Sequence, residues 1–124
     1  MASPSEESEA EAKRWQIDRR GSHCLLRLQA VGSRVGDAQR LSAVFKEAMS
    51  TLPETLAMEF TDTLLLDSSC IGQIVKAIRA LGMNGKTVYC ICDDRVWETL
   101  TIVGLEGLLL RKAASAEYWL DVGG

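Results

Sequence analysis

Residues 55–92, "TLAMEFTDTLLLDSSCIGQIVKAIRALGMNGKTVYCIC", contain the pattern that decides the fold. The segment opens with a short apolar strand at 55–60 and turns at 61–63. From about Ser69 to Leu81, apolar residues recur three and four positions apart, which is typical of a helix with one buried face. Residues 87–92 are β-branched, aromatic and nearly uncharged, and they predict a central strand covered on at least one face.

The sequence before this segment predicts a hairpin and a helix. A loosely alternating segment at 14–20 and a more apolar segment at 23–31, separated by Gly21 and Ser22, indicate two strands. A loop with two glycines follows, and apolar residues at helical spacing then predict a helix over 38–52 that starts near Asp37. A proline at position 53 ends this helix, because proline disfavours helical geometry in the residue before it.

The sequence after residue 92 predicts three further elements. Helical spacing of apolar residues indicates a helix at 93–105, and a short apolar run at 108–110 indicates an edge strand. A last helical segment is expected at 115–120. The complete order predicts one α/β domain, in which a mixed sheet of about five strands, antiparallel at its start, packs with about four helices.

Length and composition are those of a single globular domain, with 124 residues of which 47% are hydrophobic and 25% charged. We expect residues 14–124 to form the domain and residues 1–13, rich in Glu, Ser and Ala, to form a disordered acidic tail. The tail lacks the features of a secretory signal and no apolar stretch reaches transmembrane length, so we expect a cytoplasmic protein without membrane insertion. The net charge of −3 and the lack of a basic stripe argue against nucleic-acid binding.

The sequence contains no motif for catalysis or metal binding. We find no Gly-x-Ser-x-Gly elbow, no phosphate-binding loop with a lysine and no pair of carboxylates at a spacing suited to acid–base chemistry. The four cysteines form no Cys-x-x-Cys and the single histidine is His23, so neither a zinc site nor another cofactor is expected. Cys90 and Cys92 share one face of the strand at 87–92, where we expect small core residues. We therefore expect a binding protein rather than an enzyme.

Three consecutive polar residues, Asp67, Ser68 and Ser69, precede the helix that follows the strand at 55–60. Each can accept a hydrogen bond from the first free amides of a helix, and such residues are common at helix starts. One cap needs only one such residue, so three exceed what capping requires. From the residues alone, the serine pair is either a helix cap or a place where charge is added and removed.

Residues 53–109 resemble the STAS family, best known as bacterial anti-sigma-factor antagonists. The segment "HCLLRLQAVG" (23–32) also fits the strand that precedes this region in the family. The resemblance lies in the order of features, which are a strand ending in Glu59–Phe60, a short loop, "DSS" (67–69), an amphipathic helix, Gly85–Lys86, an apolar strand, a short helix and "VGL" (103–105). It implies a STAS-like fold for everything except the acidic tail.

In this family the first serine after the aspartate is phosphorylated, so the resemblance implies that Ser68 is the phosphoacceptor. The implied partners are a serine kinase of the histidine-kinase-like ATPase fold, which doubles as an anti-sigma factor, and a PP2C-type phosphatase. The unmodified protein binds the kinase and the phosphorylated protein releases it, which regulates transcription. The residues implied at the partner surface lie around the serine pair and in the loop after the second strand: Asp67, Ser68, Ser69, Cys70, Gln73, Arg34 and Asp37.

Two positions depart from the family pattern. Cys70 stands where the family usually has glycine; we expect a small packed residue that fills space near the partner, and the alternative is a redox-active thiol whose pKa is lowered by the helix start. The loop "GSRVGD" (32–37) carries Arg34 and a displaced Asp37 where the family commonly reads Gly-acid-apolar-Asp. A second function also stays open, a STAS scaffold or accessory subunit of a membrane transporter in which the serine pair is only a cap.

Overall fold

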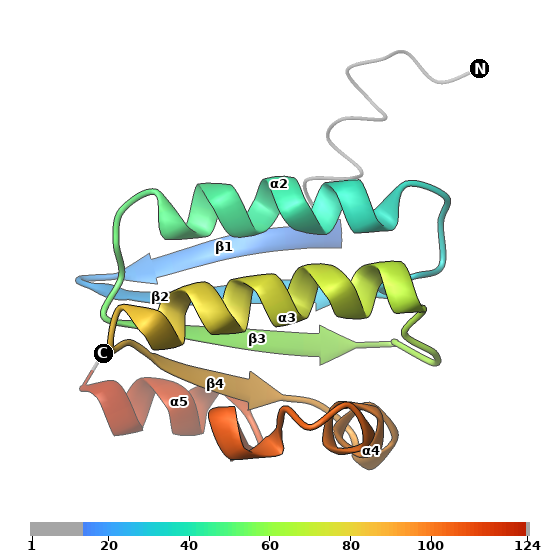
Figure 1. The fold of residues 1–124 in the computed structure, drawn as a ribbon. Coiled ribbons are helices and arrows are strands. Elements are labelled where there is room, and N and C mark those ends of the chain that lie inside the picture. The colour runs from blue at the N-terminus through green and yellow to red at the C-terminus, as the bar shows by residue number, and fades with distance from the viewer. Residues whose placement is uncertain (1–13, 124) are drawn as a thin grey trace.

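The computed structural model describes residues 14–123, so the tail predicted at 1–13 lies outside the described residues. Five strands, four α-helices and one 3₁₀ turn follow one another in this part of the chain (Figure 1). In chain order they are β1 (Trp15–Arg20), β2 (His23–Gln29), α2 (Asp37–Met49), β3 (Thr55–Thr61), α3 (Ser68–Met83), β4 (Thr87–Ile91), α4 (Asp94–Ile102), η1 (Glu106–Leu108), β5 (Leu110–Lys112) and α5 (Ser115–Val122).

The five strands form one mixed sheet in the order β1-β2-β3-β4-β5, which is also their order in the sequence. β1 and β2 form an antiparallel hairpin, in which Ile17 lies opposite Leu26, and the other neighbours are parallel. This architecture confirms the predicted α/β class with its mixed sheet and four helices. Because β2, β3 and β4 are parallel, the loops that follow them all start at the same end of the sheet, where the carboxyl ends of these strands lie.

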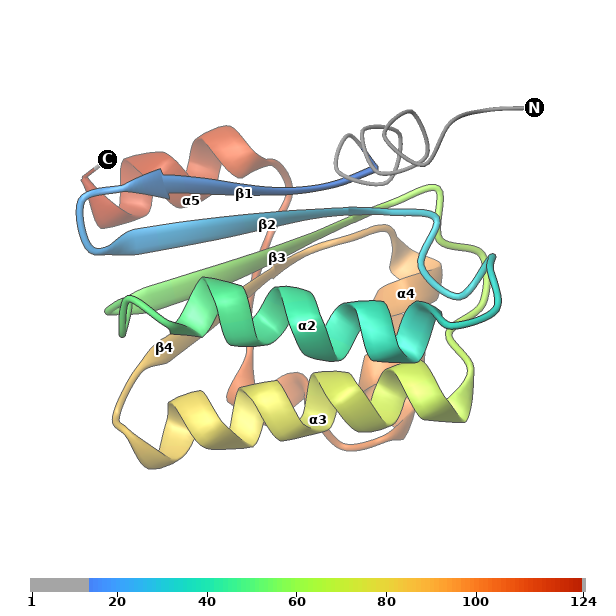
Figure 2. The ribbon, with the colours of Figure 1, turned by 90° about the horizontal axis from the view of Figure 1, so that it is seen from above.

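Helices cover both faces of the sheet. α2 and α3 lie side by side on one face, and α5 lies on the other (Figure 2). Neighbouring residues of a strand point to opposite faces, so Leu26 joins the larger core under α2 and α3 while Leu25 joins a smaller core under α5. The larger core takes Phe45 from α2 and Ile74 from α3, and the smaller one is closed by Tyr118 of α5.

The last strand differs from its prediction. A strand was expected at 108–110, but the chain forms the turn η1 there and the strand β5 begins two residues later, at Leu110. The strand begins where pairing with the neighbouring strand begins, with Leu110 opposite Tyr89. Leu109 instead buries its side chain in the larger core. Tertiary pairing therefore fixes the start of this three-residue strand.

Candidate functional site

Helix α3 begins at the three polar residues that the sequence singles out. Asp67 is the N-cap, because its backbone is extended and its Oδ1 accepts a hydrogen bond from the Cys70 amide at 2.8 Å. Ser68 and Ser69 are the first two residues of the helix and both are exposed. Neither serine hydroxyl makes a hydrogen bond with another described residue. Asp67 alone therefore supplies the cap, and capping does not account for the serine pair.

The start of α3 is a favourable place for an added negative charge. The helix is 16 residues long, and its first turn contains no acidic residue after the cap. The first amides of a helix have no partner within the helix, and the helix dipole places partial positive charge there. The carboxylate of Asp67 lies beside Ser68 and opposes this attraction. The exposed Ser68 hydroxyl can thus carry a phosphate without burying it.

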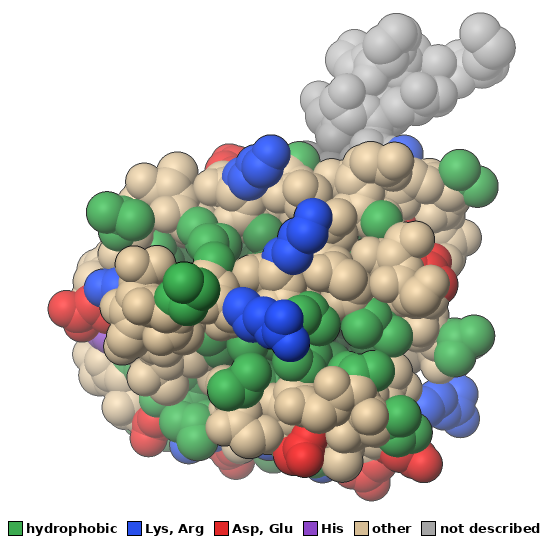
Figure 3. Space-filling view, viewed as in Figure 1, with side chains coloured by type: hydrophobic (Ala, Val, Ile, Leu, Met, Phe, Trp, Pro, Cys, Tyr) green, Lys and Arg blue, Asp and Glu red, His purple; other side chains and the backbone are tan. Residues whose placement is uncertain are grey.

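Exposed apolar side chains lie in the two loops that precede α2 and α3. Leu64 and Leu65, in the loop between β3 and α3, are 73% and 77% exposed, and Val35, in the loop before α2, is 98% exposed. Figure 3 shows hydrophobic side chains at the end of the molecule where α2 and α3 begin. We call the surface formed by Val35, Leu64, Leu65, Ser68 and Ser69 the Ser68 edge. Large apolar residues gathered on an exposed loop surface are typical of a protein-binding site.

The two loops of the Ser68 edge are joined to each other. Thr63 is buried, and its Oγ1 accepts a hydrogen bond from the Val31 amide and donates one to the Thr61 carbonyl, both at 3.2 Å. The loops also approach closely at Gly32, whose φ is +87° and whose Cβ, if it had one, would lie 3.1 Å from the Leu65 carbonyl oxygen. The loops after β2 and β3 therefore form one surface.

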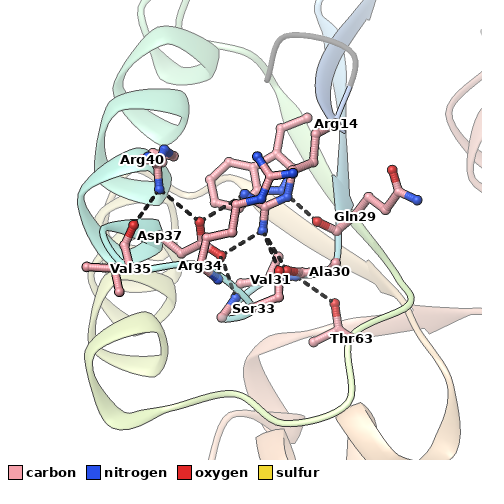
Figure 4. Close-up of polar contacts among 12 residues, drawn as sticks. Arg14, Gln29, Ala30, Val31, Ser33, Arg34, Val35, Asp37, Arg40 and Thr63 are labelled. Atoms are coloured by element: carbon pink, nitrogen blue, oxygen red, sulfur yellow. Dashed lines mark hydrogen bonds and ion pairs between the residues drawn. The ribbon is translucent and has the colours of Figure 1, made fainter. Parts of the chain in front are cut away.

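A buried ion pair holds the loop that precedes α2. Asp37 is 2% exposed, and its two carboxylate oxygens accept hydrogen bonds from the Arg14 guanidinium at 2.9 and 2.7 Å (Figure 4). The amides of Gly32 and Arg34 also donate to Oδ2. Burial by itself would raise the pKa of Asp37, but the hydrogen bonds from Arg14, Arg34 and Gly32 together lower it below its ordinary value. The carboxylate is therefore ionised and fully engaged.

This network changes the role expected for Asp37. The resemblance implied that Asp37 lies at the partner surface, but the structure places its carboxylate inside the loop, and Arg34 is the charged residue exposed on that loop. We assign Asp37 a positioning role. Arg14 was missed by the sequence analysis, because no local pattern connects it with a residue 23 positions away. The exposure of Leu64 and Leu65 could have been predicted from the sequence, because a loop with three consecutive leucines cannot easily bury all three side chains.

The environment of Cys70 decides between its two interpretations. The side chain is 1% exposed and packs in the larger core. Burial and the neighbouring Asp67 carboxylate raise the pKa of the thiol to about 12, so the predicted packed residue is confirmed and the activated thiol is wrong. The side chain lies in the core, so it does not fill space at the surface beside Ser68 and Ser69 as was expected. Gln73 is half-buried and lines a groove of about 470 Å³ between α2 and α3.

Neither a metal site nor a membrane-spanning helix is present in the described part of the chain. Within residues 14–123, no group of three or more His, Cys, Asp or Glu side chains is placed to hold a metal ion. In the same range no helix has both the length and the apolar character needed to cross a membrane. His23 lies with its Nδ1 at 2.9 Å from the hydroxyl of Thr55 on the neighbouring strand.

Comparisons with known proteins identify the fold. No family model and no curated protein matches the sequence. Among solved structures, the anti-sigma factor antagonist SpoIIAA in its unphosphorylated form is 15% identical and gives a TM-score of 0.68 over 89% of this chain and 97% of that chain. Phosphorylated SpoIIAA, a Bacillus cell fate determinant, gives 0.65 over 89% and 99% at 15% identity, and the protein TM1081 gives 0.69 over 86% of each chain at 15% identity. The chain therefore has the STAS-like fold of SpoIIAA.

Proposed function

We propose that this chain is a phosphorylation-controlled partner-switching regulator of the anti-sigma-factor antagonist type. It acts in the cytoplasm by binding, not catalysis, and holds a serine kinase of the histidine-kinase-like ATPase fold while Ser68 is unmodified. Phosphorylation of Ser68 by this kinase, which doubles as the anti-sigma factor, releases it, and a PP2C-type phosphatase restores binding. The observation that carries the proposal is the exposed Ser68 hydroxyl beside a cap that Asp67 already supplies.

The folded chain should tolerate the phosphate. A phosphoserine adds about −1.5 to −2 charges and three acceptor oxygens. The positive end of α3 stabilises a negative group at an exposed position by about 0.3–1 kcal/mol, and repulsion from the Asp67 carboxylate opposes this with a similar size. The two effects nearly cancel, so release of the partner needs no change in the fold.

A bound partner should respond much more strongly. The leucines beside Ser68 are exposed, and a partner that covers Leu64 and Leu65 excludes water from the Ser68 edge. A phosphate buried in that interface without a counter-charge loses its hydration, which costs several kcal/mol. A modification that hardly changes the stability of the folded chain can therefore control binding.

The scaffold function is not favoured by the geometry of the helix start. In a transporter accessory of this kind, the serine pair would serve only as a cap for α3. Asp67 provides that cap, and neither serine hydroxyl is committed to another described residue. The pair is thus better explained by a role at the surface.

The test uses the full chain with a histidine-kinase-like serine kinase encoded near it and ATP. Intact-mass measurement should show the addition of one phosphate, and peptide mapping should place it on Ser68. Ser68→Ala should bind the kinase and accept no phosphate. Ser68→Asp should fold normally but bind at least tenfold more weakly, a loss of about 1.4 kcal/mol or more.

Ser69→Ala is the matched control, since Ser69 is equally exposed and lies next to Ser68. This variant should still be phosphorylated on Ser68 and should bind like the parent. Phosphate on Ser69 or on another residue would contradict the proposal. Equal binding by the Ser68→Ala and Ser68→Asp variants would contradict it as well.

A further inference from the structure

Two of the four cysteines lie together where β4 ends. Cys90 lies in β4 and Cys92 directly follows the last residue of the strand. Their sulfur atoms are 3.7 Å apart. Residues two apart in an extended segment point to the same side and have Cα atoms separated by about 6.6 Å, which is within the span of a disulfide, about 4.4–6.8 Å. Closing the sulfur separation to the S–S bond length of about 2.05 Å requires a local adjustment of the backbone between the two residues.

The two thiols have different access to solvent and different neighbours. Cys90 is fully buried, and Cys92 is only half-buried. Arg111 donates a hydrogen bond from Nη2 to the Cys92 carbonyl oxygen at 3.2 Å, and the same nitrogen pairs with the Asp94 carboxylate at 2.8 Å, so a guanidinium shared with Asp94 lies beside this residue. Cys92 also directly precedes Asp93, the N-cap of α4. A cationic neighbour, a helix start and partial exposure are the features of reactive cysteines in proteins.

These surroundings set Cys92 apart from the other three cysteines. The hydrogen bond from the Cys90 thiol lowers the pKa of Cys92 and, with help from Arg111, outweighs the opposing effects of burial and of the Asp93 and Asp94 carboxylates. The same hydrogen bond, together with burial, raises the pKa of Cys90. Burial likewise raises the pKa of both Cys24 and Cys70. The shared hydrogen bond therefore shifts the pKa values of the two thiols in opposite directions.

We propose that Cys92 is an oxidation site for hydroperoxides and that Cys90 converts the oxidised form into an intramolecular disulfide. In the first step the Cys92 thiolate attacks one peroxide oxygen; the S–O bond forms, the O–O bond breaks, and the departing hydroxide takes up a proton to become water. In the second step the Cys90 sulfur attacks the Cys92 sulfenic acid; the S–S bond forms, the S–O bond breaks, and the departing hydroxide leaves with the Cys90 proton as water. The two thiols lose two electrons and hydrogen peroxide is reduced to two molecules of water.

The chain around the pair is suited to this step. The ladder between β4 and β5 ends with Ile91 opposite Lys112, so Cys92 makes no strand pairing and belongs to the short link before α4. Adjustment during disulfide formation falls on the end of β4 and on this link. The proposal is independent of the function proposed for Ser68, because it requires no partner and no phosphate.

The first experiment treats the reduced full chain with a small molar excess of hydrogen peroxide and then alkylates the remaining thiols in denaturant. Before alkylation the intact mass should fall by two hydrogen atoms, and a reductant should reverse the change; after alkylation the oxidised chain should carry two alkyl groups where the reduced chain carries four. Peptide mapping should find Cys90 joined to Cys92, with Cys24 and Cys70 alkylated. Alkylation of both Cys90 and Cys92 after peroxide treatment, or a disulfide to any other cysteine, would overturn the proposal.

Two serine variants separate the roles of the sulfurs. Cys90→Ser should accumulate a sulfenic acid on Cys92 that dimedone traps, whereas Cys92→Ser should be labelled on Cys90 at least about tenfold more slowly. Cys24→Ser is the control and should form the disulfide as the parent does. Equal labelling of the Cys90→Ser and Cys92→Ser variants would refute the assigned roles. If Cys92→Ser failed to fold, the peptide map of the parent chain would still decide the question.

Discussion

Replacing Asp37 by asparagine removes one buried negative charge and keeps the shape of the side chain. In the parent, the carboxylate accepts two hydrogen bonds from Arg14, whose side chain is 8% exposed, and further ones from the loop amides. In the variant the Arg14 guanidinium stays buried without its counter-charge. Breaking a buried ion pair by removing one partner costs about 3–5 kcal/mol. This is a large part of the roughly 5–15 kcal/mol by which a typical domain is stable.

Urea unfolding followed by circular dichroism measures this loss, and its pH dependence tests the cause. The pKa of Asp37 is lowered in the folded chain, so its contribution is fully present above the ordinary carboxyl pKa, near about 4, and is lost as the pH falls through the lowered value. The parent and the Asp37→Asn variant should therefore differ most near neutral pH. The difference should shrink in acid, where the carboxylate of the parent is protonated.

Two further variants make the reasoning refutable. Arg14→Met combined with Asp37→Asn removes both charges, so the double variant should be more stable than the sum of the single losses predicts. Asp94→Asn is the control: it breaks the surface ion pair between Asp94 and Arg111. The Asp94 side chain is 99% exposed, so this variant should hardly shift the urea midpoint. A loss below about 1 kcal/mol for Asp37→Asn, or one that persists unchanged in acid, would show that the ion pair does not hold the loop.

Two other predictions follow from the loops and from the start of the chain. Gly32→Ala should lower the free energy of unfolding, measured in urea, by about 1–2 kcal/mol, because φ is +87° at this position and the new methyl group meets the Leu65 carbonyl oxygen. Gly72→Ala, in α3, has open space for the methyl group and should raise the free energy of unfolding by about 0.5–1 kcal/mol. Equal effects of the two substitutions would contradict this. Deleting residues 1–12 keeps Arg14 and removes no apolar stripe, so the melting temperature measured by calorimetry should stay within a few degrees, and a larger fall would show that the segment is part of the folded unit.

The elements that the sequence predicted well are those with strong local patterns. The apolar spacing of α3 and the β-branched and aromatic residues of β4 depend on their own residues alone, and both lie within two residues of their predicted ends. β5 was displaced because three residues carry little pattern and pairing with β4 sets its position. Local information thus identified each long element, but it did not place every end: α2 was expected to run to residue 52 and ends at Met49, and α4 was expected to run to residue 105 and ends at Ile102.

The candidate site divides in the same way. The place of Ser68 at the start of a helix could be predicted, because caps and helix starts are encoded within a few residues. The burial of Asp37 could not, since it depends on Arg14 arriving from another element. Likewise, the alternation of side chains along a strand predicted that Cys90 and Cys92 point to the same face of the sheet. The partial exposure of Cys92 could not be predicted, because it depends on Arg111 and on the start of α4.

Each strand pairs with the strand that precedes it in the chain, so the sheet can grow in the order in which the ribosome releases it. The β1–β2 hairpin forms an edge, and each later crossover adds a strand to an edge already present. Contacts between the start and the end of the domain come last: the Tyr118 hydroxyl of α5 lies 3.1 Å from the Cys24 carbonyl and 2.7 Å from the Thr55 hydroxyl. Until α5 emerges, Leu25 and Ala57 remain uncovered, and a nascent chain therefore exposes one apolar face of the sheet until α5 has been synthesised.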